Sequence, residues 1–340
     1  MSGNLYAEAG VDLAGAERAR ERIARAIEQT RTLAARGTIG AFGGMVAVPS
    51  GIERPLLVMS MDGVGTKVLV ARAAGRFDSV GEDLVNHCVN DILVHGARPL
   101  AFLDYLAGAG LSVDEIAVLV EGVARGCLNH GMTLAGGETA QMPGLYRVGE
   151  YDLAGTIIGV VAEQEAIHGD RIEPGDVLLA YASSGLHTNG YTLARRILFE
   201  RLGLILESPL PDTGRSVADA LLAVHRSYFA AVFPALQGMH GIAHITGGGI
   251  PGNLIRVLPQ GCEARIAVAS WDWPPLFQFL REAGEVSLEE MRAVFNLGVG
   301  LIAVLPASAV PAARLAAEQA GVGTWVLGEV AKGERSVRFG

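Results

Sequence analysis

The chain has 340 residues, of which 50% are hydrophobic and 19% are charged, so it can bury a sizeable core. A formal net charge of −9, with no Lys/Arg-rich run, argues against a nucleic-acid-binding surface. The three cysteines are widely spaced, which predicts reduced thiols, and no stretch has the roughly 18 apolar residues of a membrane span. The sequence therefore predicts a soluble, cytoplasmic protein of about two domains that does not bind membranes.

In chain order, the first half alternates helical and strand-like patterns. Hydrophobic periodicity predicts helices over 14–35, 79–95 and 113–130, and strands over 55–61, 99–107, 132–135 and 151–162. The strand at 55–61 is continuously apolar, which is typical of a buried strand. A polar Gly/Pro-rich break at 168–176 predicts a boundary between a first domain, 1–168, and a second, 169–340.

The second half mixes the same two kinds of element. Strands are predicted over 177–182, 242–245, 264–268 and 298–305, and helices over 192–202, 216–236, from about 251, and over 310–320. Strands return at the C-terminus. The sequence thus predicts the α+β class, with helices and strands layered in each domain.

Strands repeatedly end in Gly-rich, hydroxyl-bearing loops. These loops are Asp62–Lys67, Gly136–Gly144, Ser183–Gly190 and Thr246–Gly249. Such loops expose backbone N–H groups, so four of them in one chain indicate phosphate-rich substrates, although four ordinary tight turns would look similar. The first loop does not match the G-x-x-x-x-G-K-[ST] phosphate loop, which disfavours a kinase of that type.

Carboxylates accompany two of these loops. Asp62 ends a strand, Glu138 lies in "GGET", and Asp83, His87 and Asp91 share one face of a predicted helix. Asp62, Asp91 and Glu138 could converge on Mg²⁺ bound to nucleotide phosphates. The alternatives are a helix N-cap for Asp83, a turn former for Asp62, an exposed helix position for Asp91, and a core or helix-surface position for His87.

Two histidines stand beside the second-half loops. His187 lies between Gly185 and Asn189, and His244 precedes "TGGG". Either side chain could donate a hydrogen bond to a phosphate or another substrate oxygen.

Together these segments resemble the phosphoribosylformylglycinamidine cyclo-ligase (AIR synthetase) family over nearly the whole chain. They are "YAEAGVD", "GAFGG", "DGVGTK", "DLVNHCVND", "FLDY", "GGETAQMPG", "SSGLHTNGY", "HITGGG" and "FNLGVG", in that order. The resemblance implies a homodimer whose N-terminal strands form a shared β-barrel, with a C-terminal α/β sandwich. It also implies ATP, Mg²⁺ and ring closure of formylglycinamidine ribonucleotide to aminoimidazole ribonucleotide, a step of purine biosynthesis.

The resemblance further implies roles for particular residues. Lys67, Asp91 and His187 are implied in catalysis, and Asp62, Asp91 and Glu138 in metal binding. The residues implied in nucleotide binding are Gly40, Gly43, Gly44, Asp62, Gly63, Gly65, Thr66, Lys67, Gly136, Gly137, Glu138 and Thr139. Those implied in binding the substrate are Ser184, His187, Asn189, Gly190, His244, Thr246, Gly247 and Gly248.

Two positions depart from the usual pattern of this family. Gln141 stands where many relatives have Glu, so no carboxylate role is expected there, whereas Thr188 replaces a common Ser and keeps the hydroxyl. Two other functions remain open: a related ATP-dependent enzyme that acts on another acceptor, and a nucleotide-binding module without chemistry. The general base also stays open: Asp91 and His187 are candidates, and a water molecule is the third alternative.

Overall fold

The computed structural model describes residues 13–38 and 41–340, so Gly40 and the motif at 6–12 lie outside the described residues. The chain divides into two compact units. Unit 1 is Met1–Ile92 with Arg98–Val160, and unit 2 is Leu93–Ala97 with Val161–Gly340. By this division residues 161–168 belong to unit 2, and the expected boundary after His168 stays a prediction.

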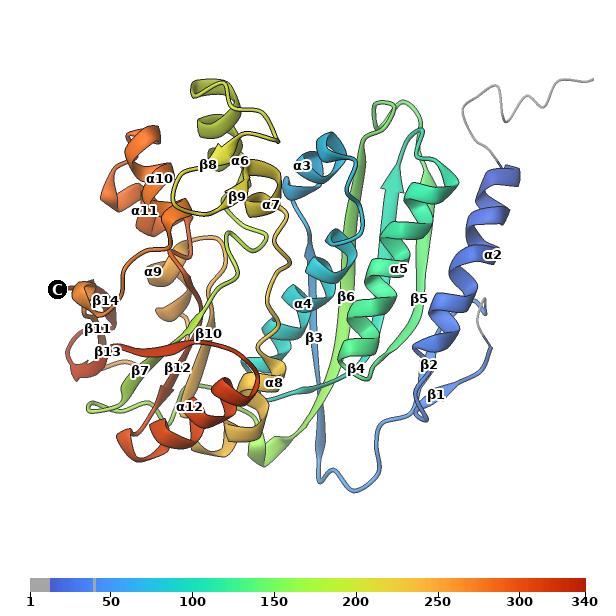
Figure 1. The fold of residues 1–340 in the computed structure, drawn as a ribbon. Helices are drawn as coiled ribbons and strands as arrows, with labels where there is room; N and C mark the ends of the chain where they lie inside the picture. The colour runs from blue at the N-terminus through green and yellow to red at the C-terminus, as the bar shows by residue number, and fades with distance from the viewer. Residues whose placement is uncertain (1–12, 39–40) are drawn as a thin grey trace, which may run out of the picture. The chain divides into compact units, whose positions relative to one another are not determined.

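Unit 1 is a four-stranded sheet with helices on one face (Figure 1). Its strand order is β3-β6-β4-β5, in which β4 runs antiparallel to β6 and parallel to β5. The elements are α2 (Leu13–Gln29), β1 (Ala35–Arg36), β2 (Met45–Val46), β3 (Pro55–Gly63), α3 (Lys67–Ala74), α4 (Val80–Leu93), β4 (Arg98–Gly108), α5 (Val113–Asn129), β5 (Thr133–Gln141) and β6 (Tyr151–Ala162).

Strand β3 is not buried, so that expectation was wrong. Leu57, Met59 and Met61 alternate along it and are exposed, whereas Val58 and Ser60 on the other face are partly buried. Successive side chains of a strand point to opposite faces, so one face of β3 carries an apolar row that nothing in the described part of unit 1 covers. The continuous apolar run therefore reflects two different environments, one on each face of the strand.

Helix α4 lies unusually close to α5, and this proximity fixes α4 over the sheet. A Cβ built on Gly81 would lie 2.4 Å from both Leu119 O and Val123 N of α5. Those are backbone atoms that cannot turn away, so only glycine allows this approach. On the sheet side, Leu84 of α4 packs where Gly155 leaves room in β6.

Unit 2 is built on a six-stranded sheet of order β10-β12-β7-β13-β11-β14, antiparallel except for β11 with β14. The strands of this sheet are β7 (Val177–Ala182), β10 (Gly241–His244), β11 (Cys262–Ile266), β12 (Val299–Leu305), β13 (Thr324–Lys332) and β14 (Ser336–Phe339), and β8 (Pro209–Leu210) and β9 (Arg215–Ser216) form a separate pair. Its helices are η1 (Glu163–Glu165), α6 (Tyr191–Arg195), η2 (Arg196–Arg201), α7 (Val217–Leu221), α8 (Phe229–Val232), η3 (Phe233–Gly238), α9 (Gly249–Leu254), η4 (Val268–Ser270), α10 (Pro275–Gly284), α11 (Leu288–Val294), η5 (Ala307–Ala309) and α12 (Val310–Gln319).

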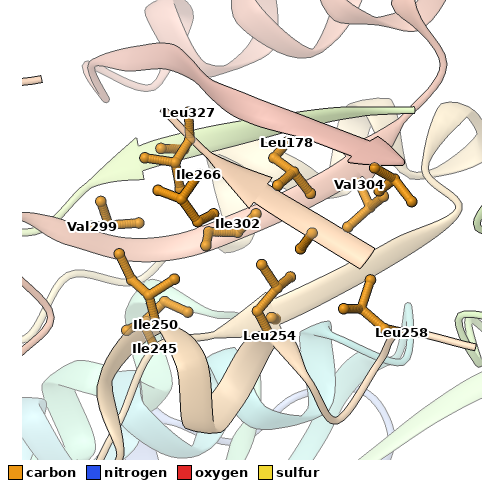
Figure 2. Close-up of a cluster of buried hydrophobic side chains, with 14 of the residues drawn as sticks. Leu178, Ile245, Ile250, Leu254, Leu258, Ile266, Val299, Ile302, Val304 and Leu327 are labelled. Atoms are coloured by element: carbon orange, nitrogen blue, oxygen red, sulfur yellow. The ribbon is translucent and has the colours of Figure 1, made fainter. Parts of the chain in front are cut away.

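The sheet of unit 2 has a hydrophobic core on each face. Alternate residues of β7 belong to different cores, Leu178 to the one that includes Leu254 of α9 and Leu179 to the one that includes Ala317 of α12. Figure 2 shows the first core, with Ile250 and Leu254 beneath the strands. Because both faces are covered, the central strands are apolar throughout. The expected layering of helices and strands, and the mixed α+β class, are confirmed.

Three elements differ from their predicted form. The helix expected over 14–35 ends at Gln29, and the "GGET" residues lie in strand β5 rather than in a loop after a shorter strand. The helix expected over 216–236 is broken: α7 ends at Leu221, and α8 starts at Phe229. Because the helix is interrupted, backbone carbonyl groups and side chains of this segment can contact the loops of unit 2.

Among the described residues, no helix combines the length and apolar composition needed to cross a membrane.

Candidate functional site

Helix α4 presents a charged stripe in unit 1. Asp83, His87 and Asp91 are four residues apart, so they share one face of the helix, as their spacing predicted. That face meets the end of β3, where Asp62 lies. The sequence thus correctly brings Asp62 and Asp91 into one cluster.

His87 lies between the two carboxylates. Its Nε2 is 2.7 Å from Asp62 Oδ2 and 3.9 Å from Asp91 Oδ2, and Ser60 Oγ donates to Asp91 Oδ2 at 2.9 Å. Burial alone would lower the pKa of His87, but the hydrogen bond to Asp62 and the neighbouring carboxylate charges raise it overall. Burial would raise the pKa of Asp62, but His87 and the Gly63 N–H, 2.7 Å away, lower it overall.

Lys67 forms a buried ion pair with Asp83. Its Nζ is 2.8 Å from Asp83 Oδ2, and both side chains have no solvent exposure. Burial lowers the pKa of Lys67, and Asp83 offsets only part of that effect. The N-cap interpretation of Asp83 is therefore wrong, because this residue lies inside α4 and neutralises a cation. Because Lys67 is the first residue of α3 and Asp83 lies in α4, the ion pair holds the start of α3 against α4.

Glu138 does not join this cluster within unit 1. It is an exposed residue of β5, which is three places along the sheet from β3. At roughly 4.8 Å between neighbouring strands, this is a separation on the order of 14 Å. The convergence of Asp62, Asp91 and Glu138 on one ion is therefore not seen in the described part of unit 1. Of the expected glycines, Gly44 packs against Ala135 of the same strand, where an added Cβ would lie 2.3 Å from the Ala135 carbonyl oxygen.

Asp104, which the sequence reasoning left without a role, is a buried carboxyl group beside "GGET". It pairs with Gly137 across β4 and β5, and a Cβ on Gly137 would lie 2.0 Å from Asp104 Oδ1. Burial raises the pKa of Asp104 to about 7. Its position in "FLDY", inside an otherwise apolar strand, is the signal that could have identified it.

In unit 2, sheet topology explains why distant loops meet. β7 and β10 both pair antiparallel with β12, so they run parallel to each other and end at the same edge of the sheet. The loop Ser183–Gly190 follows β7, and the loop Thr246–Gly249 follows β10. The sequence-predicted substrate residues in these two loops therefore lie together at one edge, beside the start of β12.

Asn296 joins the start of β12 to the first of these loops. Its Nδ2 donates to Gly185 O at 2.8 Å, and its Oδ1 accepts from Ser183 Oγ at 3.1 Å and from the Gly298 N–H at 2.9 Å. His187, in the same loop, has a φ of 61°, a left-handed conformation that costs a non-glycine residue about 1–3 kcal/mol. Such strain persists where the surrounding contacts impose it, and it concentrates at functional sites.

Asn253 shapes the second loop. This buried residue of α9 donates to Gly249 O at 2.8 Å and to Gly247 O at 3.2 Å, and its Oδ1 accepts from Thr246 Oγ1 at 3.2 Å. Gly248, with a φ of 96°, and Gly249 are both left-handed, which explains the consecutive glycines. Neither Asn253 nor Asn296 was singled out from the sequence, because each acts by holding a loop.

Asn189 faces this second loop from the first one. Its Oδ1 would lie 3.4 Å from a Cβ built on Gly247. Its buried Nδ2 has no hydrogen-bond partner among the described residues. A buried amide donor without a partner is costly, so this atom is suited to a ligand oxygen.

A cluster of three buried histidines lies behind these loops. It joins His187 and His244, both expected, with His225, which lies in the break between α7 and α8 and was missed. Their ligand atoms lie within 4.8 Å of one another, a spacing that a single metal ion can satisfy. However, the rings of His187 and His225 are stacked, with centroids 4.1 Å apart and planes 24° apart. Nitrogen lone pairs lie in the ring plane, so two stacked rings do not both point at one ion, and the geometry favours hydrogen bonding.

Comparison with known proteins identifies the family. The N-terminal domain model of the AIR synthase related proteins matches residues 44–161, and the C-terminal domain model matches residues 173–340. The chain belongs to this family. It is 48% identical to the phosphoribosylformylglycinamidine cyclo-ligase of Sorangium cellulosum (strain So ce56), over 96% of this chain and 94% of that one. The resemblance seen in the motifs is thereby confirmed, and the chain belongs with these cyclo-ligases.

Solved structures share the fold at lower sequence identity. Thiamine-monophosphate kinase from Stenotrophomonas maltophilia K279a superposes with a TM-score of 0.70 at 20% identity, covering 94% of this chain and 95% of that one. The hydrogenase maturation protein HypE in complex with ATP gives a TM-score of 0.65 at 18% identity, covering 94% and 90%. At these identities the likeness establishes the fold alone.

The Lys67–Asp83 pair predicts a characteristic stability pattern. Lys67→Met or Asp83→Leu leaves one buried charge without its counter-charge and should lower the free energy of unfolding by about 3–5 kcal/mol. The double variant, which removes both charges, should be markedly more stable than the sum of the single effects implies. Urea unfolding of all four proteins measures this coupling.

The matched control is the partly exposed pair of Arg125 and Glu82, whose atoms Nε and Oε2 are 3.1 Å apart. Arg125→Met should cost less than about 1 kcal/mol because water screens that pair. Additive losses in the Lys67/Asp83 cycle would contradict the structural role of the buried pair.

Asp104 predicts a pH dependence of stability. A pKa of about 7 in the folded chain lies above the ordinary value of 3.8, so the associated stability is present below pH 3.8 and lost as the pH rises through 7. Asp104→Asn should remove this loss. The stability of the variant relative to the unsubstituted chain should therefore grow by on the order of 2 kcal/mol between pH 5 and pH 8. Urea unfolding at both pH values tests this, and parallel pH profiles would refute it.

Proposed function

We propose that the chain catalyses the ATP-dependent closure of formylglycinamidine ribonucleotide to aminoimidazole ribonucleotide, releasing ADP and phosphate. The observation that carries this proposal is the 48% identity, spread over 96% of the chain, to an enzyme named for that cyclisation. The proposal is supported by the grouping of Asp62, Lys67 and Asp91 at the β3–α4 junction and by the two loops that meet at one edge of the unit 2 sheet.

The chemistry divides into two steps. The γ-phosphoryl group of ATP is transferred to the formamide oxygen, which turns a poor leaving group into phosphate and leaves ADP. The amidine nitrogen of the same molecule then attacks the activated carbon, phosphate departs with the oxygen, and a proton is lost as the ring becomes aromatic. The nucleophile is already tethered, so holding the chain bent supplies an entropic advantage. No covalent enzyme nucleophile is needed, which is consistent with the burial of all three cysteines.

We assign nucleotide binding to unit 1. The fold of unit 1 and unit 2 is shared with a HypE protein whose structure holds ATP, which supports ATP as the phosphoryl donor. Within unit 1, the turn Gly63–Thr66 lies beside Asp62 and leads directly into the N-terminus of α3, whose partial positive charge suits a phosphate. Lys67 itself is buried against Asp83, so we propose that it positions this turn and does not contact phosphate directly.

Mg²⁺ fits the donor set at the β3–α4 junction. Asp62 and Asp91 are carboxylates with side chains 41% and 25% exposed, and the Ser60 hydroxyl lies beside Asp91; these hard oxygen donors suit Mg²⁺ bound to phosphates. Bound there, the ion would neutralise phosphate charge. His87 holds the two carboxylates together by hydrogen bonding and charge.

We assign recognition of the ribonucleotide phosphate and amidine to unit 2. The Thr246–Gly249 loop presents backbone N–H groups held in a fixed turn by Asn253, and the neighbouring Asn189 has an amide donor without a partner among the described residues. His187 and His244 supply imidazoles at the same edge. The barrel-forming homodimer, drawn from the resemblance, likewise remains a proposal, as do the cytoplasmic location and the boundary after His168, which were drawn from the sequence itself.

The function predicts strict dependence on three components. Purified protein should release ADP and the imidazole ribonucleotide in equal amounts only when ATP, Mg²⁺ and formylglycinamidine ribonucleotide are all present. Asp62→Asn should lower kcat by about a hundredfold or more and raise the Mg²⁺ concentration needed for half-maximal rate, because it removes a charged ligand.

Asp170→Asn, an exposed carboxylate of unit 2, is the matched control and should leave both quantities unchanged. ADP formation at the same rate with and without formylglycinamidine ribonucleotide would indicate that another molecule accepts the phosphoryl group. Full activity with unchanged Mg²⁺ dependence in Asp62→Asn would contradict the assignment of Asp62 as a Mg²⁺ ligand.

The exposed apolar row of β3 supports the homodimer. Leu57, Met59 and Met61 are 47%, 63% and 68% exposed on one face of the sheet, and Tyr105 of β4 is also exposed. Met59→Lys/Met61→Lys should convert a dimer of twice the chain mass into a monomer, because it places two charges in an apolar contact. Light scattering after gel filtration measures the mass, with Leu315→Lys, an exposed apolar position in α12, as the control. An unsubstituted protein that is monomeric would overturn the proposal.

A further inference from the structure

His225 occupies the centre of the histidine cluster of unit 2, although it belongs to neither substrate loop. It is fully buried in the break between α7 and α8. Its Nε2 is 3.2 Å from His244 Nε2, its Nδ1 is 3.3 Å from Thr188 Oγ1, and its ring stacks on His187. One side chain thus contacts two residues of the Ser183–Gly190 loop and His244 at the end of β10.

The segment that carries His225 is hydrogen-bonded to the His187 loop and to the residues that flank this loop. Ser184 Oγ donates to Val224 O at 2.5 Å, Tyr191 Oη donates to Leu221 O, and Tyr228 Oη donates to Ala182 O at 3.0 Å. The carbonyl groups of Leu221 and Val224 are free to accept these bonds because the helix does not continue through this segment. The break therefore holds the His225 ring at a fixed place relative to the loop.

Hydrogen-bond chemistry couples the two ends of the His225 ring. A neutral imidazole has one N–H and one acceptor nitrogen. If Thr188 donates to Nδ1, then His225 Nε2–H donates to His244, whose Nε2 must be the acceptor; if His225 donates to Thr188, then His244 must be the donor. The direction of the hydrogen bond at Thr188 and the tautomer of His244 are therefore coupled through the His225 ring.

We propose that His225 is a positioning residue of the substrate site: it fixes the tautomer of His244 and, by stacking, the orientation of the His187 ring. This rests on the proposed function only in assigning His187 and His244 to the substrate. A fixed tautomer determines whether an imidazole donates to or accepts from a substrate oxygen or nitrogen, so a residue that holds His244 without touching the substrate still controls how the substrate is bound.

The first test uses two matched pairs of variants. His225→Phe keeps a ring that can stack on His187 but has no nitrogen, and His168→Gln, an exposed position, is its control. Thr188→Val removes the hydroxyl with almost no change in shape, and Thr188→Ser restores the hydroxyl. Long-range ¹H–¹⁵N correlation spectra of histidine-labelled protein report which ring nitrogen is protonated in each variant.

The expected spectra are specific. The unsubstituted protein, His168→Gln and Thr188→Ser should show His244 as a single tautomer, whereas His225→Phe and Thr188→Val should show it as a mixture or as the other tautomer. A His244 pattern unaffected by both substitutions would overturn the proposal, since His225 would then only fill space. Thr188→Val keeps the test decisive if His225→Phe does not fold.

The second test is kinetic and separates this inference from the proposed function. His225→Phe should raise KM for formylglycinamidine ribonucleotide or lower kcat by about tenfold, the effect of one lost hydrogen bond, while KM for ATP stays unchanged. An equal change in both KM values would contradict a role confined to the substrate loops. If the unsubstituted protein has no cyclo-ligase activity, the proposed function fails, and the spectra still decide whether His225 sets the His244 tautomer.

Discussion

The charged stripe of helix α4 is the constraint on which unit 1 depends. A helix that packs against a sheet normally buries an apolar stripe, yet α4 also brings Asp83, His87 and Asp91 to the β3 and α3 side. Buried charges are tolerated only when they are paired, and here Asp83 is neutralised by Lys67 while His87 bridges Asp62 and Asp91. The same pairs that make the packing possible therefore fix the β3–α3 turn and hold two carboxylates at its end.

The two charged clusters of α4 differ in what they can do. Lys67 and Asp83 have no solvent exposure, so they fit a structural role, and moving either would break the connection between α3 and α4. Asp62 and Asp91 remain partly accessible, so they can bind a cation that arrives with a phosphate. One face of α4 thus carries the buried, paired Asp83 and, eight residues further along, the accessible Asp91, which lies near Asp62 of β3.

The edge of unit 2 to which we assign substrate binding is held by different contacts. Its loops are positioned by hydrogen bonds from amide side chains, Asn253 within one loop and Asn296 between the first loop and β12, with no buried ion pair among the contacts described there. Backbone N–H groups and amide donors carry partial charges, which suit a phosphate without fixing a permanent cation nearby. The histidines behind these loops add groups whose hydrogen-bonding direction can be set by their neighbours.

Much of this arrangement could be predicted from the sequence, and the failures have physical causes. The i, i+4, i+8 spacing correctly grouped Asp83, His87 and Asp91, because helical periodicity is local. It could not show that Lys67 would neutralise Asp83, since that contact depends on how α3 folds back.

The remaining failures were also non-local. The break before Phe229 was missed because residues 216–236 have good helical composition and tertiary contacts override it, so His225 went unnoticed. The apolar run of β3 looked buried because a sequence does not reveal which face a partner covers.

The measurement that tests the central claim most directly follows the formamide oxygen. Formylglycinamidine ribonucleotide labelled with ¹⁸O at the formamide would be converted by the purified protein with ATP and Mg²⁺, and the released phosphate analysed by mass spectrometry. Phosphorylation of that oxygen predicts one ¹⁸O atom in each phosphate released, matching the imidazole formed. Unlabelled phosphate alongside the imidazole product would contradict the account, because ring closure would then proceed without transfer of the phosphoryl group to the substrate.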